Sequence, residues 1–473
     1  MKILMVASEA VPFSKTGGLA DVVYSLSKEE VKLGHEVSVV LPLYGVKLHS
    51  EYELKFIGAV AVPLGWRQQV ARIFTTEIEG INFYLVENEY YFGRDGIYGY
   101  YDDMERFAFF TIAVRNMISE LKLQFDIIHI HDWQAGMLPV IIKEQNSREK
   151  IFKNVKFVLT IHNPAFQGMF DPNLIVDFYE LPYSLYESGQ VRFRDKASSL
   201  KAAIMVVDKI TTVSPTHAEE LLTREGSKGL DDVLILRQND FSGIVNGIDH
   251  EEFNPSKDSH IFKKFTAKTL KNKTANKVEL AKRLGLKNAE APLFGIVTRL
   301  TWQKGIDLFL AGAREALSRG ANVVALGSGE YGLEQSLEQL RADYPDQVAI
   351  YIGYNNSLAH QIYAASDFFM MPSLFEPCGI GQLIAMRYGS LPIVRRTGGL
   401  KDTVNIFDGH NVEEATGYGF DDYDEYWMRL TINFALENFK NKAVHEQLAI
   451  NAMNYDVSWK KSAKQYLNLF KKL

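Results

Sequence analysis

The chain has 473 residues, of which 47% are hydrophobic and 23% charged, and this balance predicts a globular protein of two domains. Its net charge of −6 argues against a nucleic-acid-binding surface as its main function. The single cysteine, Cys378, excludes an internal disulfide and fits a reducing compartment.

The first residues do not resemble an export signal, because Lys2 and a short apolar run lead directly into Ser8-Glu9-Ala10. No apolar run in the sequence reaches the ~18 residues that a membrane-spanning helix needs. We therefore expect a cytoplasmic protein that binds neither a membrane nor a nucleic acid.

The first half of the chain alternates between strand-like and helix-like segments. An apolar run at 1–7 predicts a buried strand, 20–33 a helix and 36–41 the next strand. This β–α–β order implies a parallel sheet. The stretch 90–103, rich in Gly, Tyr and Asp, predicts a loop. Further segments are predicted as an antiparallel patch of strands at 53–62, 69–76 and 81–86, and a helix at 106–121.

Three later strands each end in a polar cluster. The strand at 126–130 runs into His131-Asp132-Trp133-Gln134, the strand at 155–160 into His162-Asn163, and the strand at 209–213 into Ser214-Pro215-Thr216. In open parallel sheets, ligands lie at the carboxyl ends of the strands. The repeated placement therefore predicts a binding site at this edge.

A second alternating series follows a predicted crossing at 241–254. The Lys-rich run 256–277 is predicted to be a surface segment. At the end of the chain, 458–473 has the pattern of an amphipathic helix with Tyr466, Leu467, Leu469 and Phe470 on its apolar side. The strands of this series are predicted at 293–297, 323–326, 348–352, 368–371 and 391–394.

These patterns predict a first Rossmann-like domain over 1–242 and a second over 243–457. We expect the helix at 458–473 to pack back on the first domain. The fold class is α/β, with two doubly wound domains facing across a deep cleft.

A glycine motif occurs twice. Lys15-Thr16-Gly17-Gly18-Leu19-Ala20-Asp21-Val22-Val23 and Arg396-Thr397-Gly398-Gly399-Leu400-Lys401-Asp402-Thr403-Val404 are identical at six of nine positions, and both begin with a basic residue. Glycines let the backbone approach a ligand closely, and a following helix offers free N–H groups to phosphate. For a single copy, a turn that merely caps a helix would be the favoured interpretation. Two copies favour two related domains that serve a shared site.

Three other residues of the second half could bind a ligand. Arg299 and Lys304 follow a strand and stand five residues apart, so both could reach one diphosphate; the alternative is a solvated loop. Glu376 follows a fully apolar strand and suits sugar hydroxyls, although it could instead cap a helix.

The remaining motifs are weaker. Gly327-Ser328-Gly329-Glu330-Tyr331-Gly332 matches G-x-G-x-x-G, which we interpret as a second nucleotide-facing loop, with a dehydrogenase as a minor alternative. His131 and His162 could be metal ligands, but a histidine at a strand end is more often a hydrogen-bonding group, and H-E-x-x-H and paired cysteines are absent. Cys378 has no histidine nearby in sequence, so packing explains it better than nucleophilic catalysis.

Over its whole length the sequence resembles bacterial glycogen synthases and the related plant starch synthases. The motifs that carry the resemblance, in this order, are Lys15-Thr16-Gly17-Gly18-Leu19-Ala20-Asp21, His131-Asp132-Trp133-Gln134, Thr160-Ile161-His162-Asn163, Thr212-Val213-Ser214-Pro215-Thr216, Asn246-Gly247-Ile248-Asp249, Gln303-Lys304-Gly305, Phe375-Glu376-Pro377-Cys378-Gly379 and Arg395-Arg396-Thr397-Gly398-Gly399-Leu400.

The resemblance implies a GT-B fold and transfer of glucose from ADP-glucose to the non-reducing 4-hydroxyl of an α-1,4-glucan. It implies retention at the anomeric carbon, release of ADP, and no metal or other cofactor. Absence of a glycosidase-like pair of carboxylates fits same-side attack better than double displacement.

The resemblance also implies the roles of individual residues. Lys15, Arg299 and Lys304 would hold the diphosphate, Glu376 would bind glucose hydroxyls, and His162 the 6-hydroxyl. Tyr354 would stack on adenine. Asp21 and Asp132 would line the cleft, with Asp132 either positioning the acceptor or maintaining its loop. The other residues of the implied substrate site are Gly18, Asn246, Cys378, Gly379, Thr397, Gly398, Gly399 and Leu400.

Two alternatives remain open at this point. One is a related GT-B glycosyltransferase that uses UDP-glucose. The other is a catalytically silent glucan-binding protein, against which the presence of Lys15, His162, Lys304 and Glu376 argues.

Overall fold

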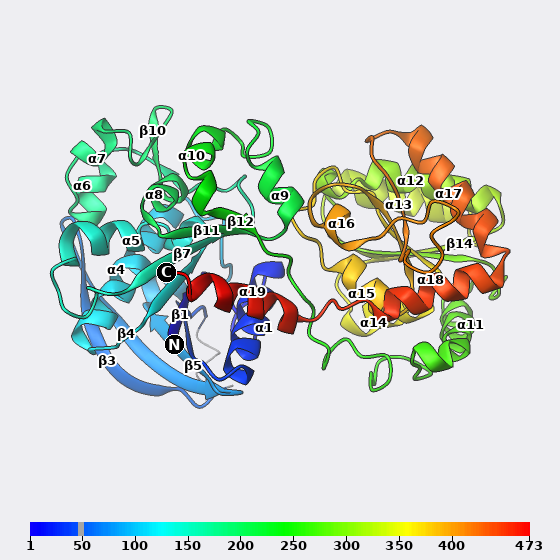
Figure 1. Ribbon diagram of the computed structural model, residues 1–473, viewed down its shortest axis with the longest axis horizontal. Helices are drawn as coiled ribbons and strands as arrows, with labels where there is room; N and C mark the ends of the chain where they lie inside the picture. The colour runs from blue at the N-terminus through cyan, green and yellow to red at the C-terminus, as the bar shows by residue number, and fades with distance from the viewer. Residues whose placement is uncertain (46–51) are drawn as a thin grey trace. The chain divides into compact units, whose positions relative to one another are not determined.

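The computed structural model describes residues 1–45 and 52–473. It divides into two compact units, the first formed by Met1–Ile244 with Trp459–Leu473 and the second by Val245–Ser458 (Figure 1). Each unit is an α/β domain with its own sheet and core.

The first unit is built on a nine-stranded sheet in the order β12-β11-β7-β6-β1-β2-β5-β4-β3. Strands β12 to β5 are parallel, and β4 and β3 extend the sheet as antiparallel strands, which confirms both the predicted β–α–β unit and the antiparallel patch. The strands are β1 (Lys2–Val6), β2 (Glu36–Pro42), β3 (Lys55–Leu64), β4 (Arg67–Ile78), β5 (Ile81–Glu87), β6 (Ile127–His131), β7 (Lys156–Ile161), β11 (Lys209–Thr212) and β12 (Phe241–Gly243).

Helices cover this sheet, and a small sheet of β8 (Met169–Phe170), β10 (Lys196–Ser198) and β9 (Arg192–Phe193) accompanies them. The predicted loop at 90–103 begins with one helical turn, α3, because the Asn88 side chain accepts from the Tyr91 N–H and caps it. The helices of the unit are α1 (Gly18–Lys32), α3 (Glu89–Phe92), α4 (Asp103–Glu120), α5 (Leu138–Ile141), α6 (Leu174–Tyr179), α7 (Ser184–Glu187), α8 (Ser199–Val206), α9 (Pro215–Glu220), α10 (Asp231–Leu236) and α19 (Trp459–Phe470).

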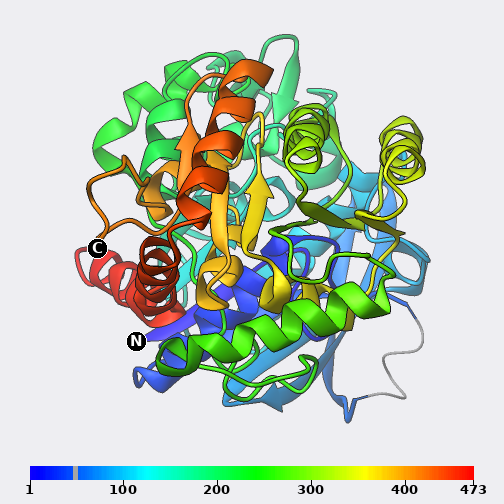
Figure 2. The same ribbon diagram turned by 90° about the vertical axis from the view of Figure 1, so that its right-hand side faces the viewer.

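The last helix of the chain, α19, belongs to the first unit and packs against α1 (Figures 1 and 2). Its Trp459, Tyr466 and Phe470 are buried in the same core cluster as Val23 and Leu26 of α1. The end of the chain therefore completes the core that its beginning starts.

The second unit is built on a six-stranded, wholly parallel sheet in the order β15-β14-β13-β16-β17-β18. Three strands, β13, β15 and β16, begin and end at the predicted residues, whereas β18 was not predicted. The strands are β13 (Leu293–Val297), β14 (Asn322–Gly327), β15 (Val348–Ile352), β16 (Phe368–Met371), β17 (Leu391–Arg395) and β18 (Tyr418–Phe420), and the helices are α11 (Lys273–Arg283), α12 (Ile306–Ser318), α13 (Tyr331–Asp343), α14 (Asn356–Ala365), α15 (Gly381–Arg387), α16 (Gly398–Thr403), α17 (Glu425–Phe439) and α18 (Lys442–Asn454).

The predicted surface segment 256–277 is wrong both in its middle, where Asp258, Ile261 and Phe265 are buried, and at its end, where α11 begins. Lys273 is buried, and its Nζ donates to the carbonyl oxygens of Ala364 and Tyr388, each at 2.9 Å. Lys277 is also buried and forms an ion pair with Asp367 at 2.9 Å. Lysine is almost never fully buried without a partner, so the lysine-rich composition of this segment suggested that it lies on the surface. The partners are remote in sequence and become visible only in the fold.

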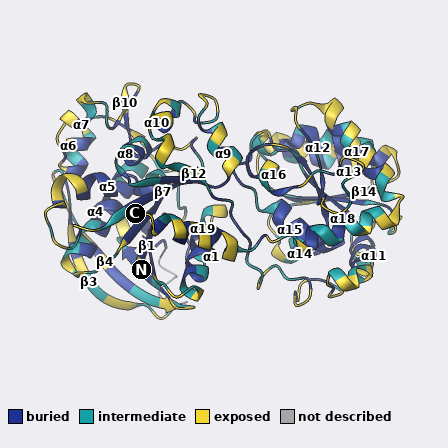
Figure 3. Cartoon of the chain, in the orientation of Figure 1, coloured by how far each residue is buried: buried dark blue, intermediate teal, exposed yellow. Residues whose placement is uncertain are grey.

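The buried strands lie inside each unit, and the exposed residues gather on the outer faces of helices such as α6, α7 and α17 (Figure 3). Within the described ranges, no helix is both long enough and apolar enough to span a bilayer.

Candidate active site

The second unit gathers most of its predicted site residues at the ends of three adjacent strands. The loop after β13 carries Arg299 and Lys304, the loop after β16 carries Glu376, and the loop after β17 carries the second glycine motif. Strands β13, β16 and β17 are neighbours and parallel, so their carboxyl ends share one edge of the sheet. Such an edge is where ligands of open α/β sheets bind.

Lys304 and Glu376 form an ion pair across two of these loops. The lysine Nζ lies 2.9 Å from Oε1 and 2.7 Å from Oε2 of the carboxylate. Glu376 is only 5% exposed, and the Ser373 hydroxyl donates to its Oε2 at 3.0 Å. The pair therefore holds one positive and one negative group in fixed positions at the sheet edge, where low solvent exposure strengthens their fields.

The glycines of the second motif allow two loops to touch. Gly398 has φ +43°, and a Cβ there would lie 2.1 Å from the carbonyl oxygen of Glu376. A Cβ at Gly399 would lie 2.3 Å from the carbonyl oxygen of Cys378, and the Gly399 N–H donates to the carbonyl of Glu376. Any side chain at either position would push the Glu376 loop away. Both glycines are thus required by packing inside the unit.

Gln382, which the sequence did not single out, holds the same two loops together. Its buried Nε2 donates to the carbonyls of Cys378 and Gly379 and to Oγ1 of Thr403. The Thr403 hydroxyl in turn donates to the carbonyl of Gly399 at 2.6 Å. No local pattern marks Gln382, because its partners lie in two separate loops.

Cys378 is buried, in agreement with the packing interpretation of its sequence context. Burial raises the pKa of its thiol to about 12, although a hydrogen bond from the Asn246 backbone N–H opposes the shift. A thiol with such a pKa stays protonated and is a poor nucleophile. Asn246 is buried beside it, and its side-chain Oδ1 accepts no hydrogen bond from the described residues. Leu400 and Thr397 are also buried in this region.

Two predicted residues of this unit stand apart from the Lys304–Glu376 pair. Arg299 is exposed, and none of the described residues forms a hydrogen bond or an ion pair with its guanidinium. Tyr354 follows β15 at the edge of the sheet and is 83% exposed. An exposed ring at a strand end can stack on a flat ligand, but the structure does not bring Tyr354 together with Glu376.

In the first unit, the loop between β1 and α1 carries the first glycine motif. Lys15 Nζ donates to Asp21 Oδ1 at 2.7 Å, and both side chains are partly exposed. Burial raises the pKa of Asp21, and the Lys15 charge opposes this shift. In contrast to the second motif, a Cβ at Gly18 would meet no atom within 4 Å. Packing therefore does not explain the glycine at this position.

Glu9, which the sequence analysis did not propose as a site residue, fixes this loop. Its carboxylate accepts hydrogen bonds from the backbone N–H and the hydroxyl of Thr16. Burial raises the pKa of Glu9, and these hydrogen bonds oppose the shift. Its place directly after a buried strand is the signal that could have identified it.

Asp132 and His162 meet at the ends of β6 and β7. Asp132 Oδ1 accepts from the His162 N–H at 2.7 Å and from the Asn163 N–H at 3.4 Å. Asp132 has φ +56°, a conformation that is rare for a residue other than glycine. Of the two roles predicted for Asp132, maintenance of the loop is the one that these contacts support.

The histidines of this region are neutral. His162 Nε2 lies 3.0 Å from His131 Nδ1, and burial lowers the pKa of His162 and of His129 to about 3 and that of His131 well below its ordinary value. A neutral imidazole offers one N–H donor and one acceptor. One ring nitrogen of His162 is used by His131, which leaves the other for a ligand hydroxyl.

Two family models match the sequence. One, described as starch synthase catalytic domain, matches residues 2–236, and another, described as glycosyl transferases group 1, matches residues 291–424. Glycogen synthases from Clostridium kluyveri and from Bacillus cereus strain Q1 are both 44% identical to the chain over the full length of both proteins.

The chain belongs to the glycogen synthase family.

Solved structures agree with this family and establish the fold. The catalytic domain of Starch Synthase IV from Arabidopsis thaliana, solved with ADP and acarbose, has a TM-score of 0.91 and 32% identity over 99% of this chain and 98% of that one. Sucrose-phosphate synthase from Thermosynechococcus elongatus has a TM-score of 0.62 at 16% identity, covering 100% of this chain and 98% of that one, which shows the fold alone. The fold class is GT-B, as predicted, and the protein is a glycosyltransferase.

The G-x-G-x-x-G match at residues 327–332 has a packing role in this glycosyltransferase. A Cβ at Gly327 would lie 2.0 Å from the carbonyl oxygen of Thr298, and one at Gly329 would lie 2.2 Å from that of Leu300. These glycines let the loop after β14 lie against the loop that carries Arg299. With the family established, the dehydrogenase alternative is wrong.

Among the residues that the structure describes, no group of three or more His, Cys, Asp or Glu side chains is arranged to hold a metal ion.

The buried carboxylate of Asp132 gives a testable pH dependence. Burial raises its pKa from the ordinary 3.8 to about 7. Between about pH 4 and pH 7 the folded protein thus holds a proton that the unfolded chain has lost, so this group lowers stability as the pH rises. The unfolding free energy of the wild type, measured by urea denaturation relative to Asp132→Asn, should fall across this window.

The buried histidines contribute equally to the pH dependence of the unfolding free energy in the wild type and in Asp132→Asn, so their contribution cancels in this comparison. Asp132→Ala serves as the second variant, because it removes the acceptor of the His162 N–H and should cost about 1–3 kcal/mol, whereas asparagine keeps an acceptor oxygen. If the difference in unfolding free energy between the wild type and Asp132→Asn does not change with pH, the pKa of Asp132 is not raised.

Proposed function

We propose that the protein is a glycogen synthase that transfers glucose from ADP-glucose to the non-reducing 4-hydroxyl of an α-1,4-glucan and releases ADP, with retention at the anomeric carbon. The observation that carries the proposal is the ion pair between Lys304 and the buried Glu376 at the ends of adjacent parallel strands, beside a glycine loop. Family membership supports the same reaction, since the relatives of this chain are glycogen synthases.

The cations would stabilise the leaving group. When the bond between glucose and the nucleotide breaks, positive charge develops on the sugar and negative charge grows on the diphosphate. Lys304, Arg299 and Lys15 are proposed to neutralise the diphosphate, since fixed positive groups stabilise such charge without reorganising. We propose on this basis that the reaction requires no metal ion or other cofactor.

Polar and aromatic groups would hold the rest of the donor. The Glu376 carboxylate, oriented by Lys304 and Ser373, can accept hydrogen bonds from glucose hydroxyls. The free nitrogen of His162 can bind the 6-hydroxyl, and the exposed Tyr354 ring can stack on adenine.

Glycine backbones and the acceptor side complete the proposal. Gly18 would bring its backbone N–H to phosphate, because no packing contact explains its lack of a side chain. Asp21 is proposed to line the substrate site beside Lys15, its ion-pair partner. On the second unit, Thr397, Gly398, Gly399, Leu400, Gly379, Cys378 and Asn246 would form the wall that receives the donor.

ADP-glucose is preferred over UDP-glucose as the proposed donor because the similar starch synthase structure was solved with ADP. A transfer assay with radiolabelled ADP-glucose or UDP-glucose on glycogen tests this choice. We expect ADP-glucose to support incorporation into glycogen far better. Faster turnover with UDP-glucose would overturn the donor assignment, and glycogen binding without any release of ADP would favour a silent glucan-binding protein.

The stereochemical proposal has its own test. Same-side attack passes through no covalent sugar–protein bond, so mass spectrometry of rapidly quenched turnover should find none. A trapped glucosyl–protein adduct would overturn it. We also propose that the protein works in the cytoplasm, which its single cysteine fits.

A further inference from the structure

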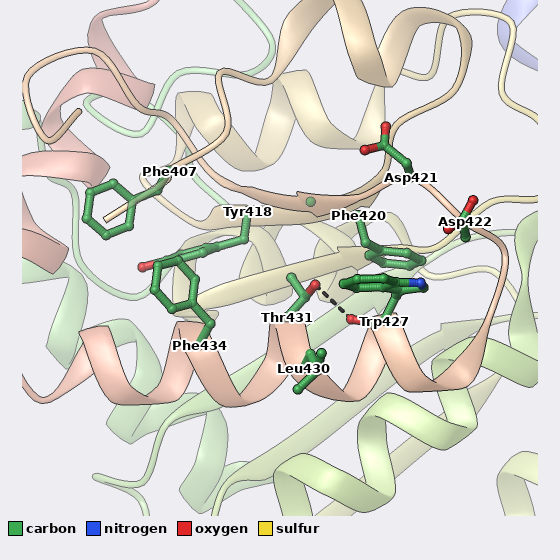
Figure 4. Close-up of a pocket in the computed structure, with 10 residues that line it drawn as sticks. Phe407, Tyr418, Phe420, Asp421, Asp422, Trp427, Leu430, Thr431 and Phe434 are labelled. Atoms are coloured by element: carbon green, nitrogen blue, oxygen red, sulfur yellow. Dashed lines mark hydrogen bonds between the residues drawn. The ribbon is translucent and has the colours of Figure 1, made fainter. Parts of the chain in front are cut away.

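A groove on the second unit is lined mainly by aromatic side chains, with two acidic residues at one end (Figure 4). It lies between β18 and α17 and has a volume of about 310 Å³, at the lower end of the range for small-molecule sites. None of the residues discussed for glucose transfer lines it. Its lining is Phe407, Tyr418, Gly419, Phe420, Asp421, Asp422, Trp427, Leu430, Thr431 and Phe434.

The aromatic side chains of the groove include both fixed and exposed rings. The Phe407 ring stacks on Phe434 at 5.8 Å, and the Tyr418 ring meets Phe434 edge-on at 5.9 Å. Trp427 and Phe434 remain 45% and 40% exposed despite their size. Figure 4 shows the Trp427 indole alongside the Phe420 ring, near the two carboxylates. Apolar surface left open in this way often marks a ligand groove.

Polar groups at the groove can bind hydroxyls. Asp421 and Asp422 lie at one end, and ionised carboxylates only accept hydrogen bonds. Arg395 donates to the carbonyl of Asp421 at 3.0 Å, and Arg396 forms an ion pair with the Asp421 side chain at 3.2 Å, so this rim is held in place. The Tyr418 hydroxyl is buried, and among the described residues it has no hydrogen-bond partner.

The chemistry of the lining selects one kind of occupant. None of the ten lining residues is a lysine or an arginine, so the groove suits no phosphate or other anion. Aromatic rings match the apolar C–H faces of sugar rings, and the acidic rim matches their hydroxyls. A second copy of the chain fits less well, because stable protein interfaces use about 20–30 residues a side.

We propose that this groove is a second, non-catalytic binding site for an α-glucan chain. The inference rests on the proposed function, in which the acceptor is an α-1,4-glucan. A branched glucan presents many chains on one particle, so a second weak contact would raise the local concentration of acceptor ends. Binding of glucan in the groove should therefore improve turnover on glycogen and not turnover on a short oligosaccharide acceptor.

The test compares Trp427→Ala with Trp66→Ala, which removes another highly exposed indole from the turn between β3 and β4. Affinity electrophoresis in glycogen gels should show binding weakened about three- to tenfold for Trp427→Ala, the range that one aromatic contact gives, and unchanged for Trp66→Ala. In kinetics, Trp427→Ala should raise KM for glycogen by a similar factor. The kcat and the KM values for ADP-glucose and maltotriose should stay within twofold of the wild type.

A direct measurement uses tryptophan fluorescence. Titration with maltoheptaose should change the emission of the wild type. Most of this maltoheptaose-induced change should be absent from both Trp427→Ala and Trp427→Phe. Because binding is measured without ADP-glucose, it remains informative if the transfer assay fails. Glycogen binding by Trp427→Ala within twofold of the wild type would overturn the proposal. It would also be overturned if mass photometry showed dimers of the wild type that Trp427→Ala does not form, because the groove would then be a contact between copies of the chain.

Discussion

Replacing Lys304 with alanine is expected to lower kcat for glucose transfer by about 10³-fold, because loss of one preorganised donor to a developing negative charge costs about 10²–10³ and Lys304 carries a full charge. Its Nζ is held 2.7 Å from Glu376 Oε2 at the edge of the sheet. Turnover with saturating ADP-glucose and glycogen measures the effect, and glycogen binding should stay unchanged.

The loss of Lys304 also leaves the Glu376 carboxylate buried without its partner, which on its own can cost about 3–5 kcal/mol of stability. Lys304→Ala combined with Glu376→Gln removes that unpaired charge, and thermal denaturation should show its Tm restored toward the wild type while kcat stays low. Lys287→Ala provides a matched control, because Lys287 forms an exposed ion pair with Asp346. A loss of less than tenfold in kcat would make Lys304 peripheral to the reaction.

The second large effect separates the two copies of the glycine motif. Gly399→Ala should lower Tm by about 3–10 °C, because its Cβ would collide with the Cys378 carbonyl and overpacking costs about 1–3 kcal/mol. Gly18→Ala should leave Tm unchanged or slightly higher, because its Cβ meets nothing and alanine favours the first turn of α1.

Activity should fall in both glycine variants, for different reasons. In Gly18→Ala the new methyl group would stand where we propose that phosphate approaches, so kcat/KM for ADP-glucose should fall at least tenfold in a correctly folded protein. Differential scanning fluorimetry and initial rates measure both quantities on the same preparations. Equal losses of Tm in the two variants, or full activity of Gly18→Ala, would contradict a ligand role for this glycine.

The strands were predictable because parallel strands covered on both faces have nearly continuous apolar sequences. For this reason β13, β15 and β16 begin and end where the sequence predicts. The short strand β18 and the small sheet β8-β10-β9 were missed, since two or three residues give too little periodicity to detect.

The sequence predicted that Lys304 and Glu376 follow strands, and it did not predict that they pair with each other. Lys304 and Glu376 each followed an apolar strand, but they are 72 residues apart, and only the sheet order makes them neighbours. The two glycine motifs have the same sequence pattern, yet one needs glycine for packing and the other does not.

Buried polar residues that tie remote loops together left no local signal. Gln382 holds the loops of Glu376 and Gly399, and Lys273 donates to carbonyls that lie about 90 to 115 residues away. Their composition suggests exposure, and only the completed fold supplies the partners that make burial favourable.

The place of α19 has a consequence for synthesis of the chain. The strands of the first unit's sheet are synthesised early, yet Trp459, Tyr466 and Phe470, which pack in the same core cluster as α1, are synthesised only after the whole second unit. The second unit is continuous in sequence, so it can finish folding while the first still exposes apolar surface. We therefore expect the first unit to finish folding after the second. A protein truncated before residue 459 should contain a complete second unit attached to an incomplete first one, and such partly folded chains are substrates of chaperones and proteases.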